Sequence, residues 1–136
     1  MRIIKDGIVT YNGTLESNKL EALSIVSEWF LSKMKYNVLQ TSVGFPIDNR
    51  RYGDKNDLEN MRSLRDLGVT TIRGSDGIMH TVTTTELNTI IQEMQVDGLS
   101  GYQTKWIIED AINSKTTIED IWVEIDTFIE NNPILT

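Results

Sequence analysis

The chain has 136 residues, of which 39% are hydrophobic and 24% charged, a balance typical of one folded domain with at most a small extension. It contains no cysteine, which excludes disulfides and thiolate metal sites and fits a reducing compartment. The net charge of −7 disfavours bulk binding to nucleic acid or to an anionic membrane, because both need a positive field.

The first thirteen residues predict a hairpin and lack the pattern of a signal peptide. Asp6-Gly7 is flanked on both sides by isoleucines and, on the far side, by Val9 and Tyr11. An Asp-Gly pair tolerates positive φ at both turn positions, so a tight turn is expected here. No apolar run in the chain reaches the roughly 20 residues that a bilayer-spanning helix needs.

A long helix is expected over residues 15–36. Leu20, Leu23, Phe30 and Met34 lie on one stripe of this helix, and further apolar residues widen the stripe beyond a normal amphipathic face. A helix that is apolar over so much of its surface is buried on two sides or meets another chain. The sequence leaves both alternatives open.

Residues 38–68 predict an edge strand, a boundary and a short helix. Pro46 lies within a partly alternating apolar pattern, and proline lacks the ladder donor, so this segment is an edge strand or a connector. The polar run at residues 48–56 is the best candidate boundary between the N-terminal hairpin and long helix, residues 1–44, and a second domain, residues 45–136. The two parts could also form one continuous globule. The short helix, at about residues 54–67, should end at Gly68.

Residues 69–82 predict a second β-hairpin. Alternating residues lie on both sides of a turn at residues 74–77, and Ile78, His80 and Val82 share one face of the returning strand. His80 is the single histidine of the chain. A lone histidine in such a strand is more often a surface or packing residue than a catalytic one.

Three further helices are expected, each preceded by a capping box that begins at Thr83, Ser100 or Thr116. Gly98 and Gly101 are expected to separate the first two helices. The middle helix, from Tyr102 onward, is apolar nearly all round, which predicts burial between its neighbours. The fold class is therefore α+β, with a small antiparallel sheet of hairpins packed with about five helices, the last three forming a C-terminal segment.

No constellation of residues predicts catalysis, a cofactor or a metal ion. One histidine and no cysteine argue against zinc, and the acidic stretch at Asp54 lacks the glycine and glutamate of a calcium loop. There is no Gly-x-Ser-x-Gly motif and no phosphate loop, and His80 would reach Ser75 only if the hairpin bent unusually. The stretch Asn-Arg-Arg-Tyr at residues 49–52 is too short, and too close to acids, to predict a nucleic-acid site.

The three tryptophans, Trp29, Trp106 and Trp122, lie on apolar stripes. Core packing explains them, and an interface hot spot is the alternative.

A set of turn and helix-cap residues recurs along residues 45–122: Tyr52, Asp76-Gly77, Val82-Thr83, Glu86-Leu87, Lys105, Ile112, Thr117 and Glu119-Asp120-Ile121. In these residues the chain resembles a domain of unknown function that is common in tailed-phage proteins, often at the C-terminal end of tail-fibre and tail-fibre-assembly proteins. The sequence departs from the family pattern at Gly53, where an aspartate is usual, and at Arg73, near which an aromatic residue is frequent.

The resemblance implies a phage tail or tail-fibre-associated protein that acts by protein–protein contact and is not an enzyme. It would be a fibre assembly factor (a chaperone) or a small structural subunit. The implied partner is a tail fibre or another tail protein, with a homo-oligomer as a further option and with neither nucleic acid nor membrane as a partner. The implied location is the host cytoplasm during assembly, and the virion tail if the protein stays in the particle. The alternative is a small phage protein that binds and inhibits a host factor through its acidic surface.

Overall fold

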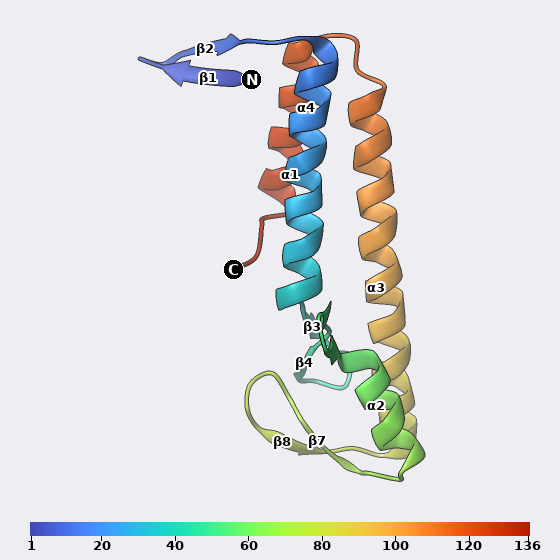
Figure 1. Cartoon of the computed structure of the whole chain (residues 1–136). Helices are drawn as coiled ribbons and strands as arrows, with labels where there is room; N and C mark the ends of the chain where they lie inside the picture. The colour runs from blue at the N-terminus through green and yellow to red at the C-terminus, as the bar shows by residue number, and fades with distance from the viewer. The chain divides into compact units, whose positions relative to one another are not determined.

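The computed structural model describes residues 1–136 and has an α+β fold, with four helices and four separate two-stranded antiparallel sheets (Figure 1). None of the helices is both long enough and apolar enough to cross a membrane. The elements are, in chain order, β1 (Arg2–Lys5), β2 (Ile8–Tyr11), α1 (Leu15–Tyr36), β3 (Val38–Gln40), β4 (Pro46–Asp48), β5 (Arg51–Tyr52), β6 (Lys55–Asn56), α2 (Asp57–Asp66), β7 (Thr71–Arg73), β8 (Met79–Thr81), α3 (Thr84–Asn113) and α4 (Ile118–Asn131).

The prediction of about five helices is wrong by one, because α3 runs without a break through Gly98 and Gly101. A glycine inside a helix costs only about 1 kcal/mol relative to alanine, which the packing of a long helix offsets. At Gly101 a Cβ would lie 3.0 Å from the Lys33 Cε, a close contact that a small shift of the flexible lysine side chain would relieve. The capping box expected at Ser100 is therefore absent, and Ser100 lies inside the helix.

The remaining caps follow the sequence more closely. The Glu86 backbone N–H donates to the Thr83 hydroxyl, and the Thr83 N–H donates to the Glu86 carboxylate, so the predicted box is confirmed. At α4 the cap is displaced by one residue from the prediction, because Thr117 rather than Thr116 accepts a hydrogen bond, from the Asp120 N–H.

The chain divides into two compact units, which are described separately. Unit 1 comprises residues 1–30 and 103–134, and unit 2 comprises residues 31–102 and 135–136. The division falls inside α1 and inside α3, and residue 45 lies within unit 2.

Unit 1 is built around a cluster from α1, α3 and α4. On α1 the buried stripe is Ala22, Val26 and Trp29, whereas Leu20 is 68% exposed, so the predicted stripe through Leu20 is wrong. Apolar residues surround this helix, so their spacing could not indicate which stripe would be packed. The Trp29 ring meets Phe128 of α4 edge to face, with the ring centroids 5.0 Å apart.

The C-terminal part of α3 is half-buried rather than enclosed. Ile108 and Ile112 lie in the cluster, but Trp106 is 53% exposed and Ile107 is 70% exposed. The prediction that this segment is buried all round is therefore wrong. A helix packed on one side leaves the opposite apolar residues in water.

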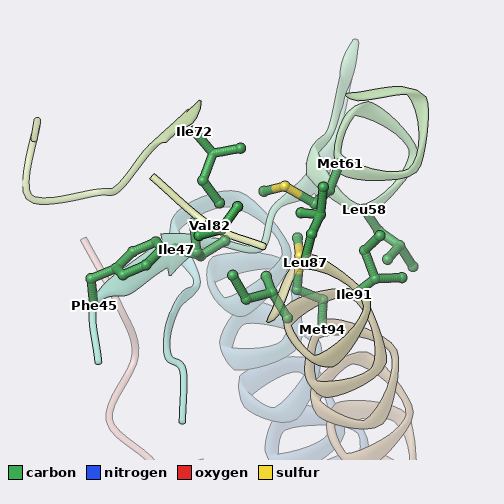
Figure 2. Close-up of a cluster of buried hydrophobic side chains, with 10 residues drawn as sticks. Phe45, Ile47, Leu58, Met61, Ile72, Val82, Leu87, Ile91 and Met94 are labelled. Carbon is green, nitrogen blue, oxygen red and sulfur yellow. The ribbon is translucent and has the colours of Figure 1, made fainter. Parts of the chain in front are cut away.

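Unit 2 has its own core, in which side chains from short strands and from two helices point toward one another (Figure 2). Pro46 begins β4, which pairs only with β3, so the predicted edge strand is confirmed. Gly68 follows α2 with a φ of 74°, as the predicted helix end requires. The core residues are Phe45, Ile47, Leu58, Met61, Ile72, Val82, Leu87, Ile90, Ile91 and Met94.

Candidate functional site

The β1–β2 hairpin, residues 2–11, is an element of unit 1 in which most residues are exposed, apolar ones included. The tight hairpin predicted at Asp6-Gly7 is confirmed, and its two strands pair from Arg2 opposite Tyr11 to Lys5 opposite Ile8. Asp6 and Gly7 have φ values of 52° and 75°, the pair of positive values that a type I′ turn requires. The local sequence therefore fixes a tight, twisted ribbon.

Apolar side chains occupy both faces of this ribbon. Ile4 and Val9 are opposite one another and are 65% and 45% exposed. Ile3 and Ile8 lie on the other face and are 37% and 66% exposed. Neither face is covered, although β-branched residues of this kind are typical of half-buried sheets.

The end of the hairpin that leads into α1, which we call its root, is held by hydrogen bonds of Asn18, a fully buried residue of α1. The Asn18 amide donates to the carbonyl of Asn12, at 3.0 Å, and its Oδ1 accepts a hydrogen bond from the Trp122 indole at 2.9 Å. Arg2 forms an ion pair with Asp126, and its guanidinium lies 4.6 Å from the centroid of the Trp122 ring. The ribbon is therefore anchored at its root, and in Figure 1 it extends away from α4.

Such a ribbon can bind another extended chain. Because β1 and β2 form a sheet of only two strands, the outer edge of each has backbone N–H and C=O groups without a ladder partner. A lone two-stranded hairpin is at best marginally stable in water, and an added strand with apolar side chains would stabilise it. Sequence reasoning identified this hairpin but missed its exposure, because alternation does not show which face will be covered.

His80, which the sequence indicates to be a surface or packing residue, lies against Phe45. The two rings are stacked, with centroids 3.9 Å apart and planes 2° apart. The His80 Nε2 lies 3.0 Å from the Asp76 Oδ2. The Ile78 backbone N–H donates to the Asp76 carboxyl and, helped by the His80 ring, holds the pKa of this carboxyl below its usual value. These contacts close the β7–β8 hairpin.

Ser75 is not arranged with His80 as a nucleophile and its base. The Ser75 hydroxyl is buried and has no hydrogen-bond partner, so it makes no bond to the imidazole. Nucleophilic catalysis needs such a bond to activate the hydroxyl. The geometry around His80 is that of a packed hairpin.

The other sequence candidates are placed apart from one another. Asp54 lies in the β5–β6 turn, and no group of three or more His, Asp or Glu side chains is placed to hold a metal ion. In the stretch at residues 49–52, Arg50 forms a bidentate ion pair with Asp57, which raises the pKa of the guanidinium. Among the tryptophans, Trp29 and Trp122 are core residues, and Trp106 lies at the surface.

Comparisons with protein-family models, curated proteins and solved structures give no match for this chain. The function is therefore inferred from the geometry of the chain and from the resemblance of residues 45–122.

Proposed function

We propose that this protein is a phage tail or tail-fibre-associated protein that acts by protein–protein contact, with the β1–β2 hairpin as its contact element. The observation that supports the contact is the exposure of Ile4 and Ile8, at 65% and 66%, on a ribbon whose outer edges are unpaired. The tail-fibre assignment rests on the resemblance of the turns and caps in residues 45–122.

The hairpin suits a partner that offers an extended segment. A strand of a fibre subunit could add to one edge of the ribbon through backbone hydrogen bonds, and its side chains could cover one apolar face. If the fibre strand binds the ribbon only transiently, the protein is an assembly factor that shields a fibre edge during folding. If the strand stays bound, the protein is a small subunit of the tail.

The acidic surface favours one alternative, in which the chain binds and inhibits a host factor. The exposed acids of α4 include Glu119, Asp120, Asp126 and Glu130. A basic partner would be attracted to such a surface, and its affinity would fall steeply as salt rises. Contact through apolar strands depends much less on salt.

Co-expression with the tail-fibre protein of the same phage, followed by size-exclusion chromatography, tests the proposal. We expect the two chains to elute together, and the double variant Ile4→Ser and Ile8→Ser to elute alone. Leu20→Ser is the matched control, because Leu20 is equally exposed, at 68%, but lies on α1.

The proposal is contradicted if the hairpin variant still elutes with the fibre or if the wild-type chain does not. Capture of a basic host protein that is released by salt would support the alternative.

A further inference from the structure

Unit 2 contains a cavity of about 330 Å³ that none of the motifs in the sequence predicted. Its walls come from the C-terminal part of α1, the β5–β6 hairpin, α2 and the middle of α3. Small-ligand sites have volumes of roughly 300–1,000 Å³, so the cavity is at the small end of that range.

The charge of the cavity wall is opposite to that of the whole chain. Lys33, Arg50, Arg51 and Arg62 line the cavity, and no aspartate or glutamate does. The chain as a whole has 13 basic and 20 acidic residues, so a wall with basic and no acidic residues differs from the average surface of this chain. The wall therefore favours a negatively charged ligand.

Three of these four charges are offset by carboxylates outside the wall. Lys33 lies 3.6 Å from Asp97. Arg62 is paired with Glu59, and Arg50 with Asp57 and Asp48. Arg51 is exposed and belongs to none of the ion pairs in the structure. One unpaired positive charge is left, which matches a ligand with one negative charge.

Asn56 supplies hydrogen-bond donors beside that charge. Arg51 and Asn56 are direct partners across the β5–β6 ribbon, so their side chains leave the same face of it. The Asn56 Oδ1 accepts the N–H of Glu59 at the start of α2, which turns the amide NH₂ group away from that bond. Guanidinium and amide N–H groups together can hold a carboxylate, sulfonate or sulfate group.

The rest of the cavity suits an apolar body. Leu58 and Met94 are 7% and 1% exposed and belong to the core of unit 2, and Leu99 is 54% exposed at the surface. Leu58 and Met94 are covered by the core, so it is Leu99 that offers the apolar surface from which an apolar ligand would displace water.

Gly98 keeps this space open. A Cβ at Gly98 would meet no atom within 4 Å, so the packing of the chain does not require a glycine there. A glycine inside a helix is nevertheless destabilising relative to alanine. The room that Gly98 leaves is part of the cavity.

From these features we infer that the cavity binds an organic monoanion with an apolar body, its anionic group at Arg51 and Asn56 and its body over Leu99 and Gly98. This site is independent of the β1–β2 hairpin, so either assignment can fail without the other.

Anilinonaphthalene sulfonate, an aromatic monoanion that fluoresces in apolar surroundings, is a suitable probe, and N-phenylnaphthylamine is its neutral counterpart. We expect the sulfonate to bind the wild-type chain at one site, and Arg51→Gln to weaken binding by about tenfold, because a hydrogen bond to a charged group is lost. Lys55→Gln is the matched control, since Lys55 lies on the other face of the same ribbon and outside the cavity wall.

Gly98 supplies a second, graded test. Gly98→Leu should fill the cavity and abolish the site. Gly98→Ala should raise the midpoint of thermal unfolding by about 4 °C and still bind, because alanine improves the helix and adds only a methyl group. Amide chemical shifts that move at Arg51, Asn56 and Gly98 on titration would place the dye.

The hairpin variant Ile4→Ser and Ile8→Ser should bind the dye like the wild type. Three results would each overturn the inference: equal binding of the neutral dye, unchanged binding in both Arg51→Gln and Gly98→Leu, and loss of binding in the hairpin variant.

Discussion

The hairpins β1–β2 and β7–β8 each contain an Asp-Gly pair in the turn and have opposite surroundings. Asp6-Gly7 is the whole turn of β1–β2, whereas Asp76-Gly77 lies in a longer loop, residues 74–78, between β7 and β8. The two glycines have nearly the same φ, 75° at Gly7 and 78° at Gly77. Yet Ile72 of β7 is 2% exposed in the core of unit 2, whereas Ile4 of β1 is 65% exposed. Turn chemistry sets the path of the backbone, and the rest of the chain decides whether a hairpin face is covered.

The two β-hairpins differ in the role of their apolar residues. In β7–β8 the apolar face belongs to the fold, with His80 stacked on Phe45 at its edge. In β1–β2 only the root belongs to the fold, through Asn18, and the strands beyond it are uncovered. We expect substitutions in β1–β2 to affect binding and substitutions in β7–β8 to affect the stability of the fold.

The largest effect is expected from isoleucine truncation in the two hairpins. Ile72→Ala should lower the free energy of unfolding by about 2–5 kcal/mol, because it leaves a hole in a packed core. Ile4→Ala should lower it by less than about 1 kcal/mol, since only strand propensity is lost. Urea denaturation followed by circular dichroism measures both, and similar losses in the two variants would refute the contrast.

A smaller effect is expected at the root of β1–β2. Asn18→Ala should lower the free energy of unfolding by about 1–3 kcal/mol, because the buried Trp122 N–H loses its acceptor. Asn60, exposed on α2, provides the control Asn60→Ala, which should change little. If the two variants are equally stable, the root does not anchor the hairpin as described.

Alanine substitution of the turn glycines gives a matched comparison of the two hairpins. A side chain in the left-handed region raises the free energy of the local backbone by about 1–2 kcal/mol. Gly77→Ala should lower the free energy of unfolding by about this amount. Gly7→Ala should open the end of the β1–β2 ribbon and weaken fibre binding, with little change in overall unfolding. Denaturation curves and co-elution with the fibre check the two outcomes, and a reversed pattern would argue against the assignment.

The smallest effect concerns the pH dependence of β7–β8. The pKa of Asp76 is held below its ordinary value of 3.8, mainly by the hydrogen bond from the Ile78 N–H. The charged carboxyl therefore stabilises the fold at neutral pH, and this contribution is lost as pH falls through the lowered pKa. Asp76→Asn should be less stable than the wild type at neutral pH, and the gap should close in strong acid. A carboxyl titration by NMR with a midpoint above 3.8 would contradict this.

Much of the local structure could be predicted because it depends on short-range chemistry. The Asp-Gly turns, the cap at Thr83 and the end of α2 at Gly68 follow from single residues whose backbone preferences are strong. The prediction of a helix break at Gly98 and Gly101 is wrong, because two glycines weaken a helix without ending it when its other residues pack well.

Which surfaces are covered could not be read from the sequence. The apolar residues around α1 allow several stripes, and the stripe through Ala22 and Val26 was selected by contacts with distant segments. The cavity is assembled from four separate elements, so no local motif could predict it. In the sequence Gly98 indicates only a helix break, and its place in the cavity wall depends on the fold.

Hydrogen–deuterium exchange of the chain, alone and with the proposed tail-fibre partner, tests the contrast between the hairpins most directly. In the free chain, amides of residues 3–10 should exchange far faster than those of residues 71–81, because local opening of an uncovered ribbon is easy. Binding of the fibre should slow exchange in residues 3–10 and leave residues 71–81 unchanged. Equal protection of both hairpins in the free chain, or protection by the fibre that omits residues 3–10, would contradict the account.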